Sequence, residues 1–287
     1  MRVGFILKPD KSNDGVLLGD LARWLLKEGH TPVVTTEDHV GTAGVEIVPE
    51  DSLGEACDLA VVLGGDGTML RASRLVADHH RPVLGINLGQ LGFLTGFAPE
   101  EAQAALRDAI DGKLQISKRM RLSVRFVRAN GDAVSLSALN DTVIHQGAMA
   151  RLVELIAAVD DDHVAAYRSD GLIVATPTGS TAYNMAAGGP ILFPGQTAMT
   201  LTPICTHSLT HRPLVVPATS TIRITLSAEI RGVVLTVDGQ WAHSFLRGDV
   251  VEMTAAPIPL LLYASKQTFF DVMRDKLHWG LRSDQPR

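Results

Sequence analysis

The sequence has 287 residues, of which 46% are hydrophobic and 20% are charged, and its formal net charge at pH 7 is −5. This length is typical of two domains, and the hydrophobic content excludes an intrinsically disordered protein. The acidic balance argues against a general nucleic-acid-binding protein, because such proteins cluster Lys and Arg to neutralise phosphates.

Through about residue 115, short apolar runs alternate with helical patterns, which is typical of a parallel-sheet α/β domain. The runs predict strands at residues 3–7, 59–63 and 83–86, and the helical patterns predict helices at residues 17–25, 69–77 and 100–110. Trp24 and the leucines around it are expected in the core. We therefore expect residues 1–118 to form a Rossmann-like domain, completed by the C-terminal tail 266–287.

After about residue 118 apolar and polar residues alternate, which is the period of half-buried antiparallel strands. Asn130-Gly131 is a two-residue hairpin signal between two such runs. Further strands are predicted at residues 152–159, 172–175, 222–226, 233–237 and 260–263, and a helix at residues 181–187. Residues 119–265 are therefore expected to form a mainly antiparallel β domain.

The predicted strand at residues 59–63 ends in Gly64-Gly65-Asp66-Gly67-Thr68, and a helix follows. In an open α/β sheet, ligands bind at this end of the strands. Glycines tolerate positive φ and let backbone N–H groups approach an anion, and the positive end of the helix dipole favours the same guest. A phosphate is therefore expected at residues 64–68.

Two common phosphate-binding motifs do not match this turn. The dinucleotide fingerprint needs a third glycine where Leu70 stands, and a P-loop needs a Gly-Lys-Ser/Thr tripeptide that the sequence lacks. The unusual member of the turn is Asp66. Its carboxylate either closes a structural Asx-turn or acts chemically on a ligand.

Three later segments add polar groups of the same kind. Asn140-Asp141 lies at the end of a predicted strand, residues 167–171 lead into the strand at 172–175, and residues 176–184 follow that strand. Thr178 and Thr181 supply hydroxyls ahead of a helical stretch, which suits either a capped helix or an anion or hydroxyl site.

The cysteines and the first residues of the chain help to predict its cellular location. Cys57 and Cys205 lack metal-ligand spacing, so we interpret both as buried packing residues. The apolar run at residues 1–10 is too short for a signal peptide, and no later run reaches the roughly 18 apolar residues of a membrane span. We therefore expect a cytoplasmic protein that binds neither membranes nor nucleic acid.

In the order in which they occur, these motifs resemble the ATP-NAD kinase family over roughly residues 58–280. The segments that carry the resemblance are 64–68, 85–95, 139–141, 168–171, 176–183, Pro203 with 207–215, and 237–240. The Gly-Gly-Asp-Gly turn alone is also similar to that of diacylglycerol, sphingosine and 6-phosphofructo-kinases. The ordered set is therefore more specific than any one motif.

The resemblance implies an NAD kinase, in which the 2′-hydroxyl of the adenosine ribose of NAD attacks the γ-phosphoryl group of ATP to give NADP. It implies that Asp66 accepts the proton, and that Mg²⁺ or another divalent cation binds through the ATP phosphates rather than to side chains. It also implies a homodimer or homotetramer. The implied NAD-binding residues are Asp66, Gly67, Phe93, Asn140, Asp141, Arg168, Asp170, Thr178, Thr181, Ala182, Tyr183, Asn184, Met185, Ala186 and Gln240.

Arg71 and Arg151 are added to this set because both lie close to matched motifs, and because an acidic protein that binds two polyanions needs local cations. Solvated surface arginines are the alternative for both. His207 and His211 receive no role, since an isolated His is more often structural. The sequence departs modestly from the family, with Asp141 where many relatives carry Glu and Ala186 where some carry Ser.

Two other functions compete with an NAD kinase. A lipid or sphingoid-base kinase shares the Gly-Gly-Asp-Gly turn but needs a membrane-facing apolar element, and no amphipathic surface helix of that kind is evident. A dinucleotide sensor would bind NAD without turnover, and the presence of Asp66 argues against it. The sequence does not distinguish ATP from polyphosphate as the donor, or NAD from NADH as the acceptor.

Overall fold

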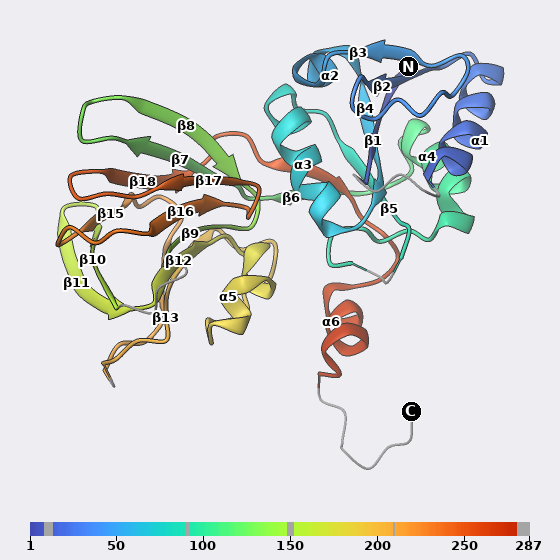
Figure 1. The fold of residues 1–287 in the computed structure, drawn as a ribbon. Helices are drawn as coiled ribbons and strands as arrows, with labels where there is room; N and C mark the ends of the chain where they lie inside the picture. The colour runs from blue at the N-terminus through green and yellow to red at the C-terminus, as the bar shows by residue number, and fades with distance from the viewer. Residues whose placement is uncertain (9–13, 90–91, 148–151, 209, 280–287) are drawn as a thin grey trace. The chain divides into compact units, whose positions relative to one another are not determined.

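The computed structural model describes residues 1–8, 14–89, 92–147, 152–208 and 210–279 (Figure 1). The chain divides into two compact units, of which the first comprises Met1–Lys118 and Leu260–Arg287 and the second comprises Arg119–Pro259. Each unit has its own hydrophobic core, as expected of separate domains.

A seven-stranded sheet forms the first unit. In spatial order its strands are β3 (Glu46–Val48), β2 (Thr31–Thr35), β1 (Arg2–Leu7), β4 (Leu59–Gly64), β5 (Val83–Asn87), β19 (Leu260–Tyr263) and β6 (Ile116–Arg119). From β3 to β19, neighbouring strands run parallel. β4 is buried along its whole length, which explains its continuous apolar sequence and confirms the predicted parallel-sheet fold.

Two helices of this unit, Asp14–Lys27 and Ala102–Ile110, pack apolar residues into the same core as the strands of the sheet. Leu18, Leu21 and Leu25 are buried and Trp24 is partly buried against the same core, as their spacing predicts. The helices are α1 (Asp14–Lys27), α2 (Leu53–Ala56), α3 (Asp66–Val76), α4 (Ala102–Ile110) and α6 (Phe269–Leu277), with 3₁₀ turns η1 (Glu50–Ser52), η2 (Ala77–His79) and η3 (Pro99–Glu101).

Two six-stranded antiparallel sheets form the second unit. One has the order β11 (Asp162–Ser169), β10 (Val153–Val159), β15 (Ile222–Leu226), β18 (Val250–Ala255), β7 (Leu122–Val127), β8 (Ala133–Ala138). The other has the order β14 (Leu214–Pro217), β13 (Ala198–Ile204), β12 (Gly171–Ala175), β9 (Asp141–Gln146), β16 (Val233–Val237), β17 (Trp241–Ser244). The 3₁₀ turn η4 (Gly179–Thr181) and the short helix α5 (Tyr183–Ala186) follow β12.

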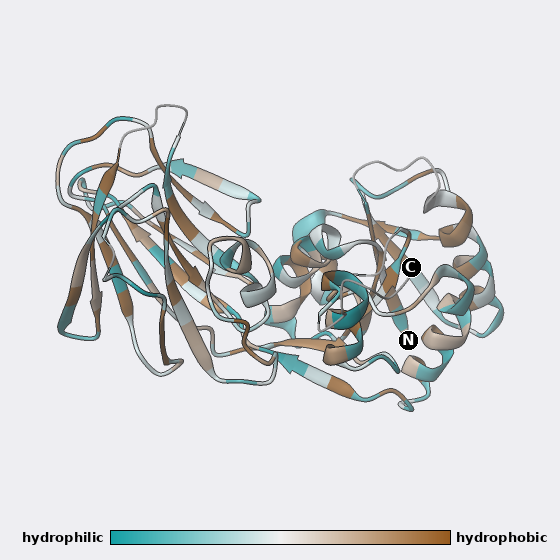
Figure 2. Ribbon diagram, turned by 90° about the horizontal axis from the view of Figure 1, so that it is seen from below, coloured by the Kyte–Doolittle hydropathy of each residue, from teal (hydrophilic) through white to brown (hydrophobic). Residues whose placement is uncertain are grey.

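Side chains from both sheets of the second unit, such as Phe126 and Leu172, meet in one core. Figure 2 shows hydrophobic and hydrophilic segments alternating along these strands, which is the pattern that predicted antiparallel structure. The predicted hairpin is confirmed, since β7 and β8 pair on either side of Gly131, whose φ is +94°. The connection is longer than the predicted two-residue turn, because the last strand pair is Val127 with Ala133.

Three predicted elements differ in the structure. The sequence places residues 260–263 in the second domain, but β19 joins the sheet of the first unit, where Leu262 pairs with Val83. A short apolar run does not specify which sheet it joins. The helix predicted at residues 181–187 is the four-residue α5, and α3 begins at Asp66 rather than Met69.

The prediction that both cysteines are buried is correct for Cys57 and wrong for Cys205, which is exposed. Burial raises the pKa of the Cys57 thiol to about 11. Cys205 follows β13 in a turn with a φ of +47°, and apolar character alone does not reveal such a position. In the described part of the chain, no helix has the length and hydropathy that a membrane span requires.

Candidate functional site

The Gly-Gly-Asp-Gly turn joins β4 to α3, and Asp66 is the first residue of that helix. Gly64, Gly65 and Gly67 do not have positive φ, so this part of the expectation is wrong. Gly65 and Gly67 instead have free space beside them, because a Cβ at either position would meet nothing within 4 Å. The space beside these glycines, at the first turn of an 11-residue helix, leaves room for phosphate oxygens.

The Asp66 carboxylate is held by the backbone of a distant loop. Its Oδ2 accepts the Phe93 N–H at 3.0 Å and its Oδ1 accepts the Leu94 N–H at 3.0 Å. These donors lie 27 and 28 residues away along the chain, so the alternative of a local Asx-turn is wrong. The side chain remains 33% exposed, which leaves the carboxylate accessible to a ligand.

Gly92 permits this arrangement. A Cβ at Gly92 would lie 2.1 Å from Asp66 Oδ1 and 2.5 Å from Thr95 Oγ1, which is closer than atoms can approach. The Thr95 hydroxyl is buried and has no hydrogen-bond partner among the described residues. The loop that contains Gly92 therefore shapes the surroundings of Asp66, although residues 90–91, which precede it, lie outside the described part of the chain.

Arg71 does not present a free cation. Its Nη1 lies 2.9 Å from Asp38 Oδ1, its Nε lies 2.6 Å from Glu50 Oε1, and its side chain is only 15% exposed. Two carboxylates therefore already compensate its charge. These contacts tie α3 to the segments that follow β2 and β3.

The sequence missed Lys276, whose Nζ lies 4.0 Å from Asp66 Oδ2 and 5.0 Å from the centroid of the Phe93 ring. The Phe93 ring also contacts Phe269, with the ring centroids 6.4 Å apart. Lys276 and Phe269 belong to α6. No local pattern near Asp66 indicates a residue so far away in the sequence.

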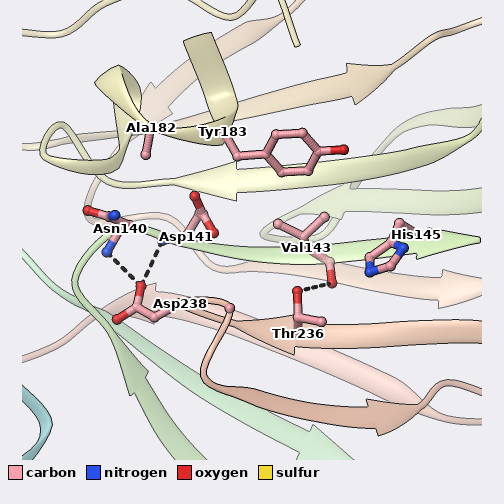
Figure 3. Close-up of a pocket in the computed structure, with 9 residues that line it drawn as sticks. Asn140, Asp141, Val143, His145, Ala182, Tyr183, Thr236 and Asp238 are labelled. Carbon is pink, nitrogen blue, oxygen red and sulfur yellow. Dashed lines mark hydrogen bonds between the residues drawn. The ribbon is translucent and has the colours of Figure 1, made fainter. Parts of the chain in front are cut away.

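A pocket of 290 Å³ in the second unit collects several predicted residues (Figure 3). It is lined by Asn140, Asp141, Val143, His145, Ala182, Tyr183, Thr236, Asp238 and Gly239. Figure 3 shows Asn140, Asp141 and Asp238 gathered at one end and His145 at the other. The pocket thus combines carboxylates, an amide and an exposed aromatic ring, which suit a ligand with hydroxyls and a flat base.

Asp238 organises this end of the pocket. Its carboxylate accepts the backbone N–H groups of Leu139 at 2.8 Å, Asn140 at 2.8 Å and Asp141 at 3.1 Å. Burial raises the pKa of Asp238, and these three hydrogen bonds oppose the rise. Asp238 is a positioning residue that sequence reasoning left without a role, although it lies in the matched segment 237–240.

Asp141 is 6% exposed. Burial, reinforced by the charge of Asp238, raises the pKa of Asp141 to about 7. Its carboxyl group therefore changes protonation near neutral pH and can then either donate or accept a hydrogen bond.

The segment from residue 176 to 184 packs closely against the Asn140 turn. A Cβ at Gly179 would lie 2.0 Å from the Asn140 carbonyl oxygen, and the Thr176 N–H donates to that same oxygen at 2.9 Å. The Thr178 hydroxyl is buried without a partner in the described residues, which marks it as a possible ligand contact. α5 has only four residues, so the helix-dipole argument for this segment does not apply.

Asn184 is fully buried, and its side-chain amide forms hydrogen bonds within the protein. Its Nδ2 donates to the carbonyl oxygens of Ser180 and Pro190, and its Oδ1 accepts the hydroxyls of Thr200 at 3.0 Å and Thr202 at 2.7 Å. Every hydrogen-bonding position of the amide is therefore used by the fold. Thr181, Met185 and Ala186, the other predicted residues around α5, are partly or fully exposed.

Three predicted residues lie away from the pocket. Arg168, Asp170 and Gln240 are exposed and do not line the pocket, and the Arg168 side chain approaches Glu154 at 3.9 Å. Arg151 lies outside the described residues. The His211 ring packs at a tilt against Tyr167, with the ring centroids 4.8 Å apart, so its described contact is structural.

Comparison with known proteins gives one consistent family. Residues 3–114 match the family model of the ATP-NAD kinase N-terminal domain, and residues 139–264 match that of the ATP-NAD kinase C-terminal domain. The chain is 41% identical over 280 residues to the NAD kinase of Solibacter usitatus, covering 97% of this chain and 98% of that protein.

Two solved structures share the fold. The crystal structure of yeast NADH kinase complexed with NADH matches with a TM-score of 0.90 and 25% identity, over 99% of this chain and 90% of that one. The crystal structure of an NAD kinase from Archaeoglobus fulgidus in complex with ATP matches with a TM-score of 0.75 and 26% identity, over 95% of this chain and 97% of that one.

Proposed function

This chain belongs to the ATP-NAD kinase family, and on that premise we propose that it transfers the γ-phosphoryl group of ATP to the 2′-hydroxyl of the adenosine ribose of NAD, giving NADP. The observation that carries the proposal is the Asp66 carboxylate, which two backbone N–H groups fix beside an open glycine backbone. A fixed, accessible carboxylate next to a phosphate-binding surface is what a proton acceptor in phosphoryl transfer requires.

In the proposed reaction, Asp66 accepts the proton of the 2′-hydroxyl as the ribose oxygen forms a bond to the γ-phosphorus. The bond between that phosphorus and the oxygen it shares with the β-phosphate breaks, and ADP leaves with the electron pair. The backbone at residues 65–67 and the positive end of α3 hold the donor phosphates. The chain therefore contributes positioning and charge stabilisation together with one base.

A divalent cation fits this chain as a partner of the donor. In the described residues, His, Cys, Asp and Glu side chains form no cluster of three that could hold a metal ion. We propose that Mg²⁺ enters with ATP and is held mainly by its phosphates, where it neutralises their charge. Asp66 remains the base in this arrangement.

The residues proposed to bind NAD are those expected from the sequence, less two. They are Asp66, Gly67, Phe93, Asn140, Asp141, Arg168, Asp170, Thr178, Thr181, Ala182, Tyr183, Met185, Ala186 and Gln240, with Arg151 proposed on its sequence position alone. Asn140, Asp141, Ala182 and Tyr183 line one pocket, which supports their place in this set. We assign Arg71 and Asn184 to the fold instead, because internal partners already occupy both side chains.

The compartment and assembly are also proposals. Two cysteines without a disulfide are typical of a reducing compartment, which supports a cytoplasmic location. The exposed residues Leu214 and Val215 lie on β14, an edge strand, and support contact between copies in a homodimer or homotetramer. Light scattering of the purified protein measures the assembly directly.

A donor and acceptor matrix tests the function. ATP or polyphosphate is combined with NAD, NADH or diacylglycerol, and the products are separated by chromatography. We expect ATP and Mg²⁺ to convert NAD to NADP and diacylglycerol to remain unchanged. Folded protein that binds NAD but forms no phosphorylated dinucleotide with either donor would instead support a dinucleotide sensor.

A further inference from the structure

The C-terminal helix α6 is fixed within the first unit. Thr268 caps its start, with its hydroxyl accepting the Asp271 N–H at 3.2 Å, while Asp271 Oδ2 accepts the Thr268 N–H at 2.9 Å. Val272 and Met273 are buried, at 8% and 4% exposure. A capped helix with two buried apolar anchors holds a defined orientation, so the direction of its polar side chains is determined.

That orientation places Lys276 at the proposed base. Its Nζ lies 4.0 Å from Asp66 Oδ2, at the outer limit of an ion pair, and 5.0 Å from the centroid of the Phe93 ring. The aromatic face attracts the ammonium group and holds it beside the carboxylate. The ammonium makes no hydrogen bond to any described residue, and the side chain is 30% exposed. Its three N–H donors are therefore available to a ligand.

Phosphoryl transfer is helped by positive charge placed close to the group that is transferred. The base accepts a proton from the attacking hydroxyl, and the transferred phosphorus lies on the other side of that oxygen. Charge spreads over the three equatorial phosphoryl oxygens, where positively charged side chains stabilise the transition state. The Lys276 ammonium group lies 4.0 Å from the Asp66 carboxylate. A hydroxyl group that approaches Asp66 therefore brings the phosphoryl oxygens within reach of Lys276.

Arg71 on α3, a cation that the sequence analysis favoured as a ligand contact, is held by Asp38 and Glu50. Among the described cationic side chains, Lys276 is the one within 4.0 Å of the Asp66 carboxylate. We infer that Lys276 binds the transferred γ-phosphoryl group of the nucleotide donor. This inference rests on the proposed function, because it takes Asp66 to be the base of that reaction.

Lys276→Met tests this inference by removing the charge while keeping an unbranched side chain. We expect kcat for NADP formation to fall about 100-fold, as when one transition-state donor is lost elsewhere. We also expect the preference for ATP over ADP, measured by calorimetric titration, to fall toward one, because ADP lacks the group that Lys276 contacts. NAD affinity should stay within about twofold, and Lys276→Arg should restore part of the ATP preference.

Arg274→Met is the matched control, since it removes one positive charge from the same helix at a residue that pairs with Asp271. We expect it to keep wild-type turnover and ATP preference. An unchanged ATP preference in Lys276→Met, an equal loss in Arg274→Met, or a rise in kcat would overturn the inference. The titrations need no turnover, so they remain decisive if the wild-type protein forms no NADP and the proposed function itself fails.

Discussion

Asp141 and Asp238 are joined by two hydrogen bonds and lie at one end of a pocket. The Asp141 N–H donates to Asp238 Oδ1 at 3.1 Å, and the Asp238 N–H donates to the Asp141 carbonyl oxygen at 2.9 Å. The same Asp238 carboxylate also accepts the N–H groups of Leu139 and Asn140. One partly buried carboxylate therefore fixes the turn that presents Asn140 and Asp141 to the pocket.

Asp238→Asn should loosen this turn. The amide keeps one acceptor oxygen but turns an NH₂ group toward backbone N–H donors, so at least one buried N–H loses its partner. We expect a loss of roughly 1–3 kcal/mol in the free energy of unfolding. NAD affinity should also fall, and both are measured by denaturant titration and calorimetry.

Asp161→Asn provides the control, because Asp161 is exposed in the turn between β10 and β11. Asp161→Asn should change neither the free energy of unfolding nor the NAD affinity. If Asp238→Asn kept wild-type stability and NAD affinity, Asp238 would not be a positioning residue.

Asp141 should make the protein less stable as pH rises. Burial raises its pKa to about 7, whereas an unfolded Asp titrates near 3.9. Between these values the folded state binds more protons than the unfolded state, so its contribution to the free energy of unfolding falls with pH, at most by roughly 1.4 kcal/mol per pH unit. The loss should end above the folded pKa.

Denaturant titrations at pH 5, 6, 7 and 8 measure this slope, and Asp141→Asn should reduce it. The amide has no proton to lose, so the variant should gain stability relative to wild type as pH rises from about 4 to about 7. Parallel stability curves for the two proteins would show that Asp141 does not titrate in this window.

The first unit was largely predictable because its central strands are buried on both faces. Val61 and its neighbours on β4 form an unbroken apolar run, and the glycines that follow mark the turn. The strand β19 was misplaced because four apolar residues pair equally well with either sheet. Its position depends on contact with Val83, which is distant in sequence.

The site was predictable where one short segment carries its chemistry, as at Asp66. It was not predictable where a role depends on partners from elsewhere. In sequence, Asn184 resembles a ligand contact. In the structure its side chain is buried, and its Oδ1 accepts the hydroxyls of Thr200 and Thr202 on β13. Lys276 looks like an ordinary residue of a charged helix, and only the folded chain brings it to Asp66.

Asn184→Ala should therefore impair folding more than binding. It removes the partner of two buried threonine hydroxyls and two backbone carbonyls, so we expect a loss of roughly 2–4 kcal/mol in the free energy of unfolding. Where the variant remains folded, NAD affinity should stay within about threefold of wild type. A large loss of affinity at unchanged stability would return Asn184 to the NAD-binding set.

Gly92→Ala should disable the site without unfolding the protein. The new Cβ would lie 2.1 Å from Asp66 Oδ1, so the carboxylate or the loop must move. We expect kcat to fall about 100-fold, since small misplacements of a base are costly. Gly89→Ala is the matched control in the same loop, because a Cβ there meets nothing within 4 Å. Equal activity of the two variants would contradict this account.

Asp66→Asn tests the base with minimal change in shape. The amide oxygen can still accept one backbone N–H from residues 93–94, so we expect the thermal unfolding temperature to fall by only a few degrees. An amide does not accept the hydroxyl proton, and kcat for NADP formation should fall by about 10²- to 10⁴-fold. ATP and NAD should still bind when measured by calorimetry. A folded variant with near-normal turnover would remove Asp66 from the role of proton acceptor and leave it a loop anchor only.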